Sequence, residues 1–166
     1  PSRHNDPLIR YADILLMYAE AANEYHGPDF EETLGGQQLG CYPILKLIRK
    51  RAGIEPGADG MYGLKKNMTQ KQMRQAIQEE RRLEFAFEGL HYYDILRWGT
   101  ASEELNRQFT GMKLTTDPDN YTASAVDKDG YAICQRRVFT IGKSELWPIP
   151  LSEIQINGNL TQNPGY

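Results

Sequence analysis

The sequence lacks several features that would assign a function directly. No run of about 18 apolar residues occurs among its 166 positions, so no segment is expected to cross a membrane as a helix. The two cysteines, Cys41 and Cys134, form no Cys-x-x-Cys pair and lie at no metal-ligand spacing from a histidine. A disulfide and two free thiols both remain open, so cysteine usage does not fix the redox compartment. The formal net charge of −3 gives no electrostatic reason to expect nucleic-acid binding.

Motifs of common catalytic sites are also missing. The chain has no Gly-x-Ser-x-Gly elbow, and Gly35-Gly36 lacks the Lys-Ser/Thr that a phosphate-binding loop needs. Glu88 and His91 have the Glu-x-x-His spacing of carboxylate di-metal bundles, but such sites need two of these motifs. No metal and no cofactor is therefore expected. The chain begins at Pro1 without a methionine, a basic segment or an apolar signal core, which predicts a mature product or a fragment.

The residues that are present are typical of a folded domain. Hydrophobic residues make up 40% of the chain and charged residues 25%, which are globular values. Ten tyrosines, five phenylalanines and two tryptophans leave aromatic side chains to spare for a binding surface. We expect a single domain over residues 1–166, with a helical part at 1–108 and a loop-rich part at 109–166.

Apolar spacing and boundary residues predict helices in the first part. A helix over residues 7–24 begins at Asp6-Pro7, and a second one over residues 39–52 ends at Gly53. Residues 29–38, between these helices, are predicted to form a polar loop. On the second helix, Ile44, Leu45, Leu47 and Ile48 are expected inward, and Lys46, Lys50 and Arg51 outward.

Two capping boxes mark further helices. Thr69 and Gln72 open a long helix, which Gly89 is expected to interrupt before a helical segment over residues 90–98. Thr100 and Glu103 form the second box and start a short helix. The pattern predicts a mainly α fold of helical hairpins.

After about residue 107 the sequence becomes polar and rich in turn formers. Residues 110–130 are predicted to be an exposed loop with at most short strand pieces, and residues 138–141 a short strand. Two prolines exclude residues 146–150 from a central strand, and residues 152–156 are expected to form one helical turn.

Carboxylates lie on the apolar stripe of the long helix. The stripe residues are Met73, Ile77, Leu83 and Phe87, with Glu80 and Glu84 among them. Such carboxylates are costly to bury unless cations meet them. We expect a structural polar network of Glu80, Glu84, Glu88, Arg81, Arg82, Asp94 and Arg97. The alternative is a glycoside-active enzyme that uses Glu80 and Glu84, but carboxylates one turn apart on a rigid helix leave no room for a sugar between them.

Three pieces of the chain stand out by their motifs and their order. The first is RYADILLMYAEAA at residues 10–22, followed by IRKRAG at 48–53. The second is ERRLEFAFEG at 80–89, which leads into YDILRW at 93–98. The third is LWPIP at 146–150, then Glu153-Ile154 and NLTQNPGY at 159–166. Together they resemble the C-terminal part of the SusD/RagB family of outer-membrane nutrient-binding lipoproteins.

The resemblance implies a non-enzymatic role and a longer parent polypeptide. Members of the family begin with a signal peptide and a lipidated cysteine, which lie outside this chain, and continue with tetratricopeptide-like hairpins in an α–α superhelix. They are surface-exposed at the cell outer membrane, cover a TonB-dependent, SusC-like transporter and capture glycans, or sometimes peptides, for import. Their sugar contacts come from variable loops, so the resemblance implies fold and role but not the ligand.

Ligand contacts are therefore sought in the loops outside the matching pieces. Tyr121 and Tyr131 stand in the polar loop beside amides, carboxylates and arginine, which is a composition that carbohydrate sites favour. The further candidates are Asp117, Asn120, Arg136, Tyr42 and Tyr62. The sequence thus favours oligosaccharide binding without turnover. A tetratricopeptide-like adaptor for a protein or peptide is the alternative, although no second hairpin copy follows the first.

Overall fold

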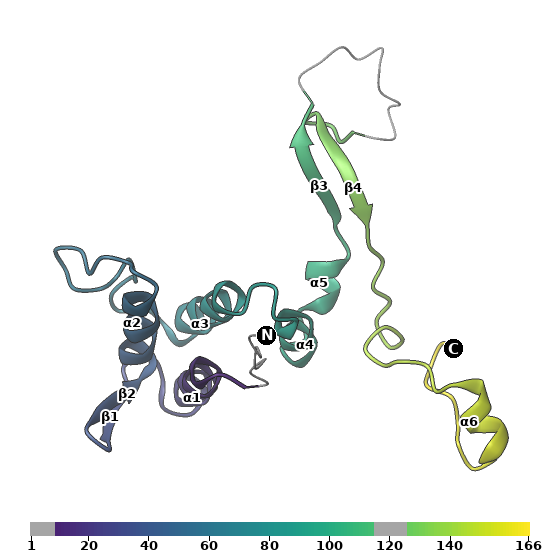
Figure 1. Cartoon of the computed structure of the whole chain (residues 1–166), viewed down its shortest axis with the longest axis horizontal. Helices are drawn as coiled ribbons and strands as arrows, with labels where there is room; N and C mark the ends of the chain where they lie inside the picture. Colours follow the sequence, from purple (N-terminus) through teal and green to yellow (C-terminus); the bar gives the residue numbers. More distant parts are fainter. Residues whose placement is uncertain (1–8, 115–125) are drawn as a thin grey trace, which may run out of the picture. The chain divides into compact units, whose positions relative to one another are not determined.

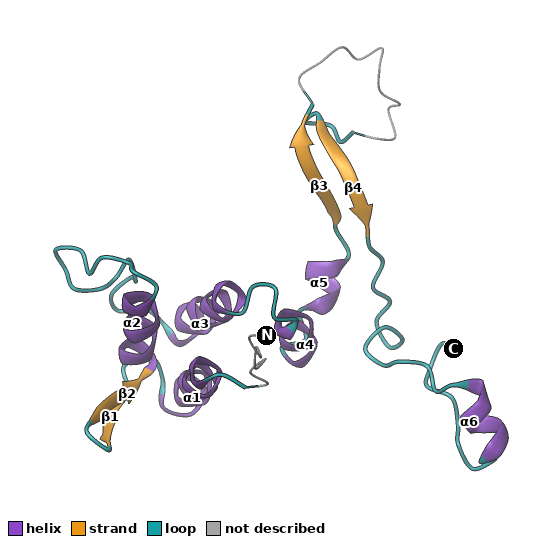
Figure 2. Ribbon diagram, in the orientation of Figure 1, coloured by secondary structure: helices purple, strands orange, loops and turns teal. Residues whose placement is uncertain are grey.

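A computed structural model of the chain describes residues 9–114 and 126–166 (Figure 1). The described elements are α1 (Tyr11–His26), β1 (Glu31–Leu34), β2 (Gln37–Gly40), α2 (Cys41–Arg51), α3 (Gln70–Glu84), α4 (Leu90–Arg97), α5 (Ala101–Leu105), β3 (Gln108–Lys113), β4 (Tyr131–Arg136) and α6 (Leu151–Ile156). The mainly α fold class with short strands is confirmed (Figure 2). The chain divides into two compact units, residues 1–91 and 92–166. Its organisation as a single domain remains a prediction.

The first unit is built on three helices that pack around one core. α1 contacts both α2 and α3, and the β1–β2 hairpin lies against α1 and α2. The fully buried side chains come from all three helices and include Leu16, Ile44, Leu45, Met73 and Ile77. Alanines Ala19 and Ala22 are buried on α1, where small side chains allow a neighbouring helix to approach closely.

α1 begins later than predicted. Arg10 is its N-cap, and Ile9 and Arg10 lie outside the helix, so the predicted start at residue 7 is wrong; Asp6 and Pro7 lie outside the described residues. The Arg10 side chain caps no backbone N–H of α1, because a guanidinium group has no acceptor, and it is used instead in an ion-pair network described below. The helix ends at Gly27, whose φ of +96° favours glycine.

The predicted loop at residues 29–38 is largely a β-hairpin. β1 and β2 pair antiparallel, with Glu31 opposite Gly40 and Leu34 opposite Gln37. Gly35 and Gly36 make the two-residue turn with φ of +58° and +80°, which is the geometry that favours tight hairpins. Because β2 runs to Gly40, α2 begins at Cys41 and not at residue 39 as predicted.

The inward residues of α2 agree with the prediction at three of four positions. Ile44, Leu45 and Ile48 are buried, but Leu47 is exposed. At the start of α3 the capping box is confirmed, because the Thr69 hydroxyl accepts the Gln72 N–H and the Gln72 side chain accepts the Thr69 N–H.

α3 ends earlier than expected. Its last residue is Glu84, five residues before Gly89, and Phe87 has a left-handed φ of +66°. Leu83 and Phe87 are exposed, so the predicted stripe continues only from Met73 to Ile77. The buried face then passes to Glu80 and Arg81, two charged residues with 6% and 4% exposure, because ion pairs compensate their burial.

The second unit has its own small core of Ile95, Ala101 and Phe139. α5 begins after Thr100, but the predicted second capping box is wrong because the Thr100 side chain makes no cap bond. Instead, its hydroxyl donates to Glu104 Oε1 at 3.0 Å. Arg97 pairs with Asp94 one turn earlier, at 2.9 Å.

Two strands form a ladder with bulges in this unit. β3 and β4 pair antiparallel with Gln108 opposite Arg136, so residues 110–113 of the predicted loop are strand. The predicted strand at 138–141 is absent. The Asn106 side chain bonds both the N–H and the C=O of Phe139, which takes these backbone groups away from any ladder. α6 at Leu151–Ile156 agrees with the predicted helical turn.

Within the described ranges, we find no helix with the length and apolar character that crossing a membrane requires.

Candidate functional site

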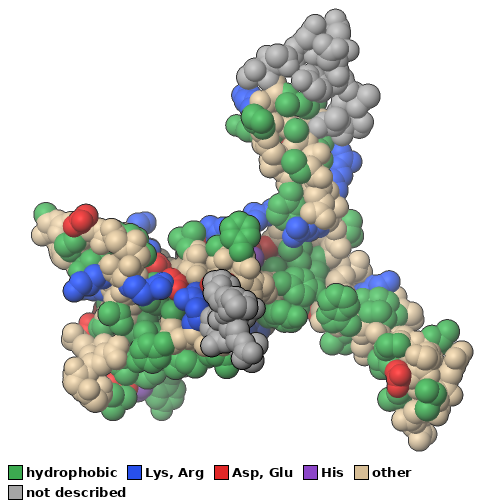
Figure 3. Space-filling model, viewed as in Figure 1, with side chains coloured by type: hydrophobic (Ala, Val, Ile, Leu, Met, Phe, Trp, Pro, Cys, Tyr) green, Lys and Arg blue, Asp and Glu red, His purple; other side chains and the backbone are tan. Residues whose placement is uncertain are grey.

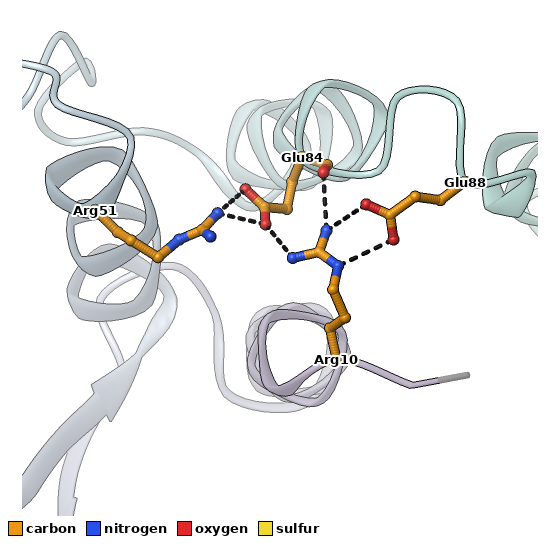
Figure 4. Close-up of polar contacts among 4 residues, drawn as sticks. All are labelled: Arg10, Arg51, Glu84 and Glu88. Atoms are coloured by element: carbon orange, nitrogen blue, oxygen red, sulfur yellow. Dashed lines mark hydrogen bonds and ion pairs between the residues drawn. The ribbon is translucent and has the colours of Figure 1, made fainter. Parts of the chain in front are cut away.

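The carboxylates of α3 and the following turn meet arginines from two other helices (Figure 4). Arg10 Nη1 donates to Glu84 Oε1 at 2.8 Å, and its Nη2 and Nε donate to both oxygens of Glu88 at 2.7 and 3.0 Å. Arg51, from the end of α2, donates to both carboxylate oxygens of Glu84. Arg10 Nη2 also donates to the Glu84 backbone C=O at 3.0 Å, in the last turn of α3. These hydrogen bonds hold the pKa of Arg10 above its usual range, with Glu88 the larger cause and Glu84 the next.

Two further ion pairs join the same helices. Arg49 Nε donates to Glu80 Oε2 at 2.7 Å, and Arg81 Nη1 donates to Asp13 Oδ1 at 2.8 Å. The guanidinium groups of Arg10 and Arg81 lie 4.9 and 5.1 Å from the ring centroid of buried Phe85. The set therefore ties α1, α2 and α3 together by charge-assisted hydrogen bonds around an aromatic ring.

The cations of this set differ from those that sequence proximity suggested. Arg81, Arg82 and Arg97 were the expected partners of Glu80 and Glu84. The structure brings in Arg10, Arg49 and Arg51, which are 31 to 78 residues away from the carboxylates that they meet. Arg82 pairs with Glu79 on the surface of α3, and Arg97 pairs with Asp94 within α4. Helical periodicity identifies the carboxylates, but a distant partner has no local signal.

The carboxylate ridge does not have the arrangement of a glycosidase pair. The side chains of Glu80 and Glu84 are 8% and 7% exposed, and arginines occupy their oxygens. A glycosidase needs two accessible carboxyl groups on either side of the scissile bond. The geometry therefore favours a structural role for this set.

The candidate contacts in the polar loop either lie far apart or fall outside the residues that the structure describes. Asp117, Asn120 and Tyr121 lie outside the described residues. Tyr131 and Arg136 are the two ends of β4, so about 16 Å of extended strand separates them and one sugar ring cannot touch both. Tyr131 has a cationic neighbour, since Lys113 Nζ lies 5.6 Å from its ring centroid.

Tyr42 is part of the core and not of a binding surface. It is 7% exposed, its hydroxyl accepts the Met68 N–H at 2.9 Å and donates to the Lys65 C=O at 3.2 Å. Both bonds fix the loop before α3 against α2. We therefore remove Tyr42 from the candidate contacts, because a ligand could not reach its ring without opening the core.

Tyr62 lines a pocket, which we call the Tyr62 pocket. Its volume is about 400 Å³, and its walls are Gly36, Gln37, Gln38, Pro43, Lys46, Leu47, Lys50 and Tyr62. Tyr62 has a left-handed φ of +53°, a conformation that costs a non-glycine residue about 1 kcal/mol or more. Two bonds hold it there: Arg49 Nη1 donates to the Tyr62 C=O at 3.0 Å, and the Tyr62 N–H donates to the Pro56 C=O at 3.1 Å.

The other residues that line the Tyr62 pocket were not among the predicted ligand contacts. Gln37 and Gln38 come from β2, where a polar loop was predicted, and the hairpin turn brings them beside α2. Lys46 and Lys50 were predicted as outward residues, and their spacing of one helical turn was the available signal. An aromatic residue, two amide residues and two lysines thus line one hollow, where the ring can stack against a sugar and the amides can bond its hydroxyls.

A second pocket of about 310 Å³ lies between α1 and the hairpin. Its walls are Tyr18, Ala21, Ala22, Tyr25, His26, Phe30 and Glu32. The Tyr18 hydroxyl donates to Glu32, and this bond, helped by burial, raises the pKa of Tyr18 to about 12. The hydroxyl therefore stays protonated and bound to the carboxylate at neutral pH. It is thus already bonded within the protein, whereas Tyr62 lines the larger of the two pockets.

The cysteines and acidic groups show no metal chemistry in the described part of the chain. Cys41 is buried and Cys134 exposed, and both are free thiols. Burial raises the pKa of Cys41 to about 11, so its thiolate is scarce at neutral pH. Among residues 9–114 and 126–166, no group of three or more metal-binding side chains is close enough to hold an ion.

The comparisons with known proteins all indicate the same family. The sequence profile of the SusD family matches residues 2–166. SusD-like protein P2 of Formosa agariphila is 29% identical over 159 residues, which is 95% of this chain and 25% of that protein.

Solved structures give the same result. A SusD-like carbohydrate binding protein from Bacteroides fragilis is 31% identical, with a TM-score of 0.67 over 93% of this chain and 28% of that one. A SusD homolog from Bacteroides thetaiotaomicron is 27% identical, with a TM-score of 0.60 over 96% of this chain and 26% of that one. The chain therefore spans about a quarter of the length of these relatives.

Proposed function

The chain belongs to the SusD family, and from that premise we propose that it serves in binding oligosaccharide without turnover. The observation that carries the proposal is the match of nearly the whole chain to a SusD-like carbohydrate binding protein. The ion-paired state of Glu80 and Glu84 supports binding over hydrolysis, because a carboxylate held by arginine is a poor general acid or nucleophile.

Within the described residues, the Tyr62 pocket is our proposed place of sugar contact. Its aromatic ring offers a stacking face, and Gln37 and Gln38 offer amide groups for sugar hydroxyls. The Tyr62 backbone is fixed by bonds to Arg49 and Pro56, so the Cα from which the ring extends is held in place before a ligand arrives. Such preorganisation reduces the entropy lost on binding. The loop candidates Asp117, Asn120 and Tyr121, together with Tyr131 and Arg136 of β4, stay a proposed second contact.

We further propose that the sugar is passed to a TonB-dependent, SusC-like transporter. The protein would then act at the surface of the outer membrane, anchored by a lipid in its full-length form. The family membership supports this setting.

A glycan-array screen of this chain and of a full-length protein that contains it tests the proposal. We expect binding to at least one oligosaccharide class, with no shorter products when the bound sugar is recovered and chromatographed. Tyr62→Ala should weaken binding about tenfold or more, because the stacking face is removed. Tyr93→Ala, at an exposed tyrosine of α4 outside the Tyr62 pocket, is the matched control and should leave affinity unchanged.

Two results would contradict the proposal. Binding of peptides and of no glycan would favour the adaptor hypothesis. Hydrolysis products that disappear in a folded Glu84→Gln variant would favour an enzyme. If sugar binds but neither Tyr62→Ala nor the Tyr121→Ala, Tyr131→Ala pair changes the affinity, both proposed contacts are wrong.

A further inference from the structure

Positive charge is concentrated on α2 and divided between its two faces. Residues 46–51 contain Lys46, Arg49, Lys50 and Arg51, with no acidic residue among them. Arg49 and Arg51 turn to α3, where Glu80 and Glu84 neutralise them. Figure 3 shows Lys and Arg side chains in blue over α2. The carboxylates of α3 therefore neutralise the two arginines of α2 but not its two lysines.

Lys46 and Lys50 both line the Tyr62 pocket. They are one helical turn apart, so their side chains are neighbours on the same face of α2. In the part of the chain that the structure describes, no carboxylate lies within ion-pair distance of either one. Lys46 Nζ lies 6.0 Å from the ring centroid of Tyr42, a weak contact that leaves its charge uncompensated.

The remaining walls of the Tyr62 pocket add no negative charge. They are Gly36, Pro43, Leu47, Tyr62 and the neutral amides of Gln37 and Gln38. Glu31 accepts from Gln38 Nε2, on a wall residue, at 2.8 Å but does not itself line the pocket. Two lysines without a carboxylate partner that line one hollow repel each other and attract an anion.

We propose that the Tyr62 pocket selects an acidic sugar unit, whose carboxylate or sulfate group is held by Lys46 and Lys50. This inference rests on the proposed function and adds the chemical class of the ligand. The Tyr62 ring stacks against the sugar, and the anionic substituent lies toward α2. An anion that bridges both lysines gains two charge-assisted hydrogen bonds and removes their mutual repulsion.

Titration calorimetry with matched sugar pairs tests the inference on the full chain. One pair is trigalacturonate and its methyl ester, which share the same sugar backbone and differ in that methylation removes the charge of the carboxyl groups. The other pair is a sulfated galactose trisaccharide and its desulfated form. We expect the acidic member of at least one pair to bind tenfold tighter, and the pair that shows this identifies carboxylate or sulfate. The advantage should shrink when NaCl rises from about 0.05 to 0.3 M, because salt screens exposed charges.

Lysine variants locate the contact. Lys46→Gln and Lys50→Gln should each weaken binding of the acidic sugar about 5- to 20-fold and leave the neutral partner within twofold. Lys71→Gln, at an exposed lysine of α3 outside the pocket, has the same charge change and should have no effect.

The outcomes separate this inference from the proposed function. Equal affinity for acidic and neutral sugars, with loss of both in Tyr62→Ala, would overturn the acidic selectivity and leave the proposed function standing. Tighter acidic binding that all three lysine variants retain would also overturn it, because the anion must then be held elsewhere. A lack of binding to any sugar would contradict the proposed function itself.

Discussion

Glu84 joins three helices through a single carboxylate. It accepts hydrogen bonds from Arg10 before α1 and from Arg51 at the end of α2, while its own backbone C=O accepts from Arg10 as well. Its side chain is only 7% exposed. A carboxylate in this position is stabilising only while its cations stay in place, and its removal takes the carboxylate partner from Arg51 and leaves Arg10 paired with Glu88.

Glu84→Gln is therefore expected to destabilise the fold. An amide keeps the shape but loses the charge that the arginines meet, so we expect a loss of about 2–3 kcal/mol in the free energy of unfolding. Urea denaturation followed by circular dichroism measures this loss.

Glu79→Gln is the matched control on the same helix. Its pair with Arg82 is exposed and local, so we expect a loss below about 0.5 kcal/mol. The Arg82 hydrogen bond lowers the pKa of Glu79, so this small contribution is present at neutral pH and is lost as pH falls through that lowered pKa. Equal losses for the two variants would show that Glu84 is no more than a surface charge.

Tyr42 and Tyr62 show how little residue type alone says about a site. Both are tyrosines in or beside a loop of the sequence, and both were candidates for sugar contact. The Tyr42 hydroxyl satisfies a buried N–H, while Tyr62 is held at a positive φ beside a pocket. The difference depends on packing partners 13 to 26 residues away.

The β1–β2 hairpin is the element that sequence reasoning missed, and it shapes the Tyr62 pocket. Its strands have four residues each and are mostly exposed, so they have too few apolar positions for a strand signal. Gly35-Gly36 was the only local indication, as a turn that can take positive φ at both positions. The hairpin ends at Gly40, directly before α2.

Gly40→Ala should disrupt the junction of the hairpin and α2. Gly40 has a φ of +143°, and a Cβ there would lie 2.2 Å from the backbone oxygen of Phe30. Because backbone must move to relieve this clash, we expect a loss of about 2–4 kcal/mol in unfolding free energy. Thermal denaturation measures the effect.

Gly36→Ala separates the clash from the conformational cost. Gly36 also has a positive φ, of +80°, but a Cβ there would meet no atom within 4 Å. Its loss should be about 1–2 kcal/mol. A Gly40→Ala variant no less stable than Gly36→Ala would argue against the close approach of β1 and β2 at Phe30.

At the scale of the whole molecule, the two units have separate cores. The core of the first unit draws on α1, α2 and α3. The ion pairs of Arg10 with Glu84 and of Arg49 with Glu80 also lie within residues 1–91. The core of the second unit is much smaller and consists of Ile95, Ala101 and Phe139. The stability of the chain is therefore concentrated in its first unit.

A chain that ends at His91 is expected to fold. It retains the buried side chains from Leu15 to Phe85 and the ion pairs that join its helices. We expect helical circular dichroism and a cooperative urea transition. Ile77→Ala should lower the free energy of unfolding by about 2–4 kcal/mol, because it leaves an internal cavity. A non-cooperative transition for this shorter chain would show that residues 92–166 are needed for the core of the first unit.

Local sequence patterns are sufficient to identify the family, the mainly α fold class and the position of several helix boundaries. These properties depend on local patterns, such as the capping box at Thr69 and the motifs at residues 80–89, which act over a few neighbouring residues. Helical periodicity also placed carboxylates on a buried face of α3, where Glu80 is now seen.

The packing of the folded chain selects the cations that meet those carboxylates and the side chains that share a pocket. Arg10 and Arg51 reach Glu84 across more than 30 residues, and the hairpin brings Gln37 and Gln38 to Lys46 and Lys50. Such contacts depend on how helices pack and where a turn reverses the chain. No local pattern encodes the partner, because many arginines have the same local surroundings and only the packed fold brings one of them to a given carboxylate.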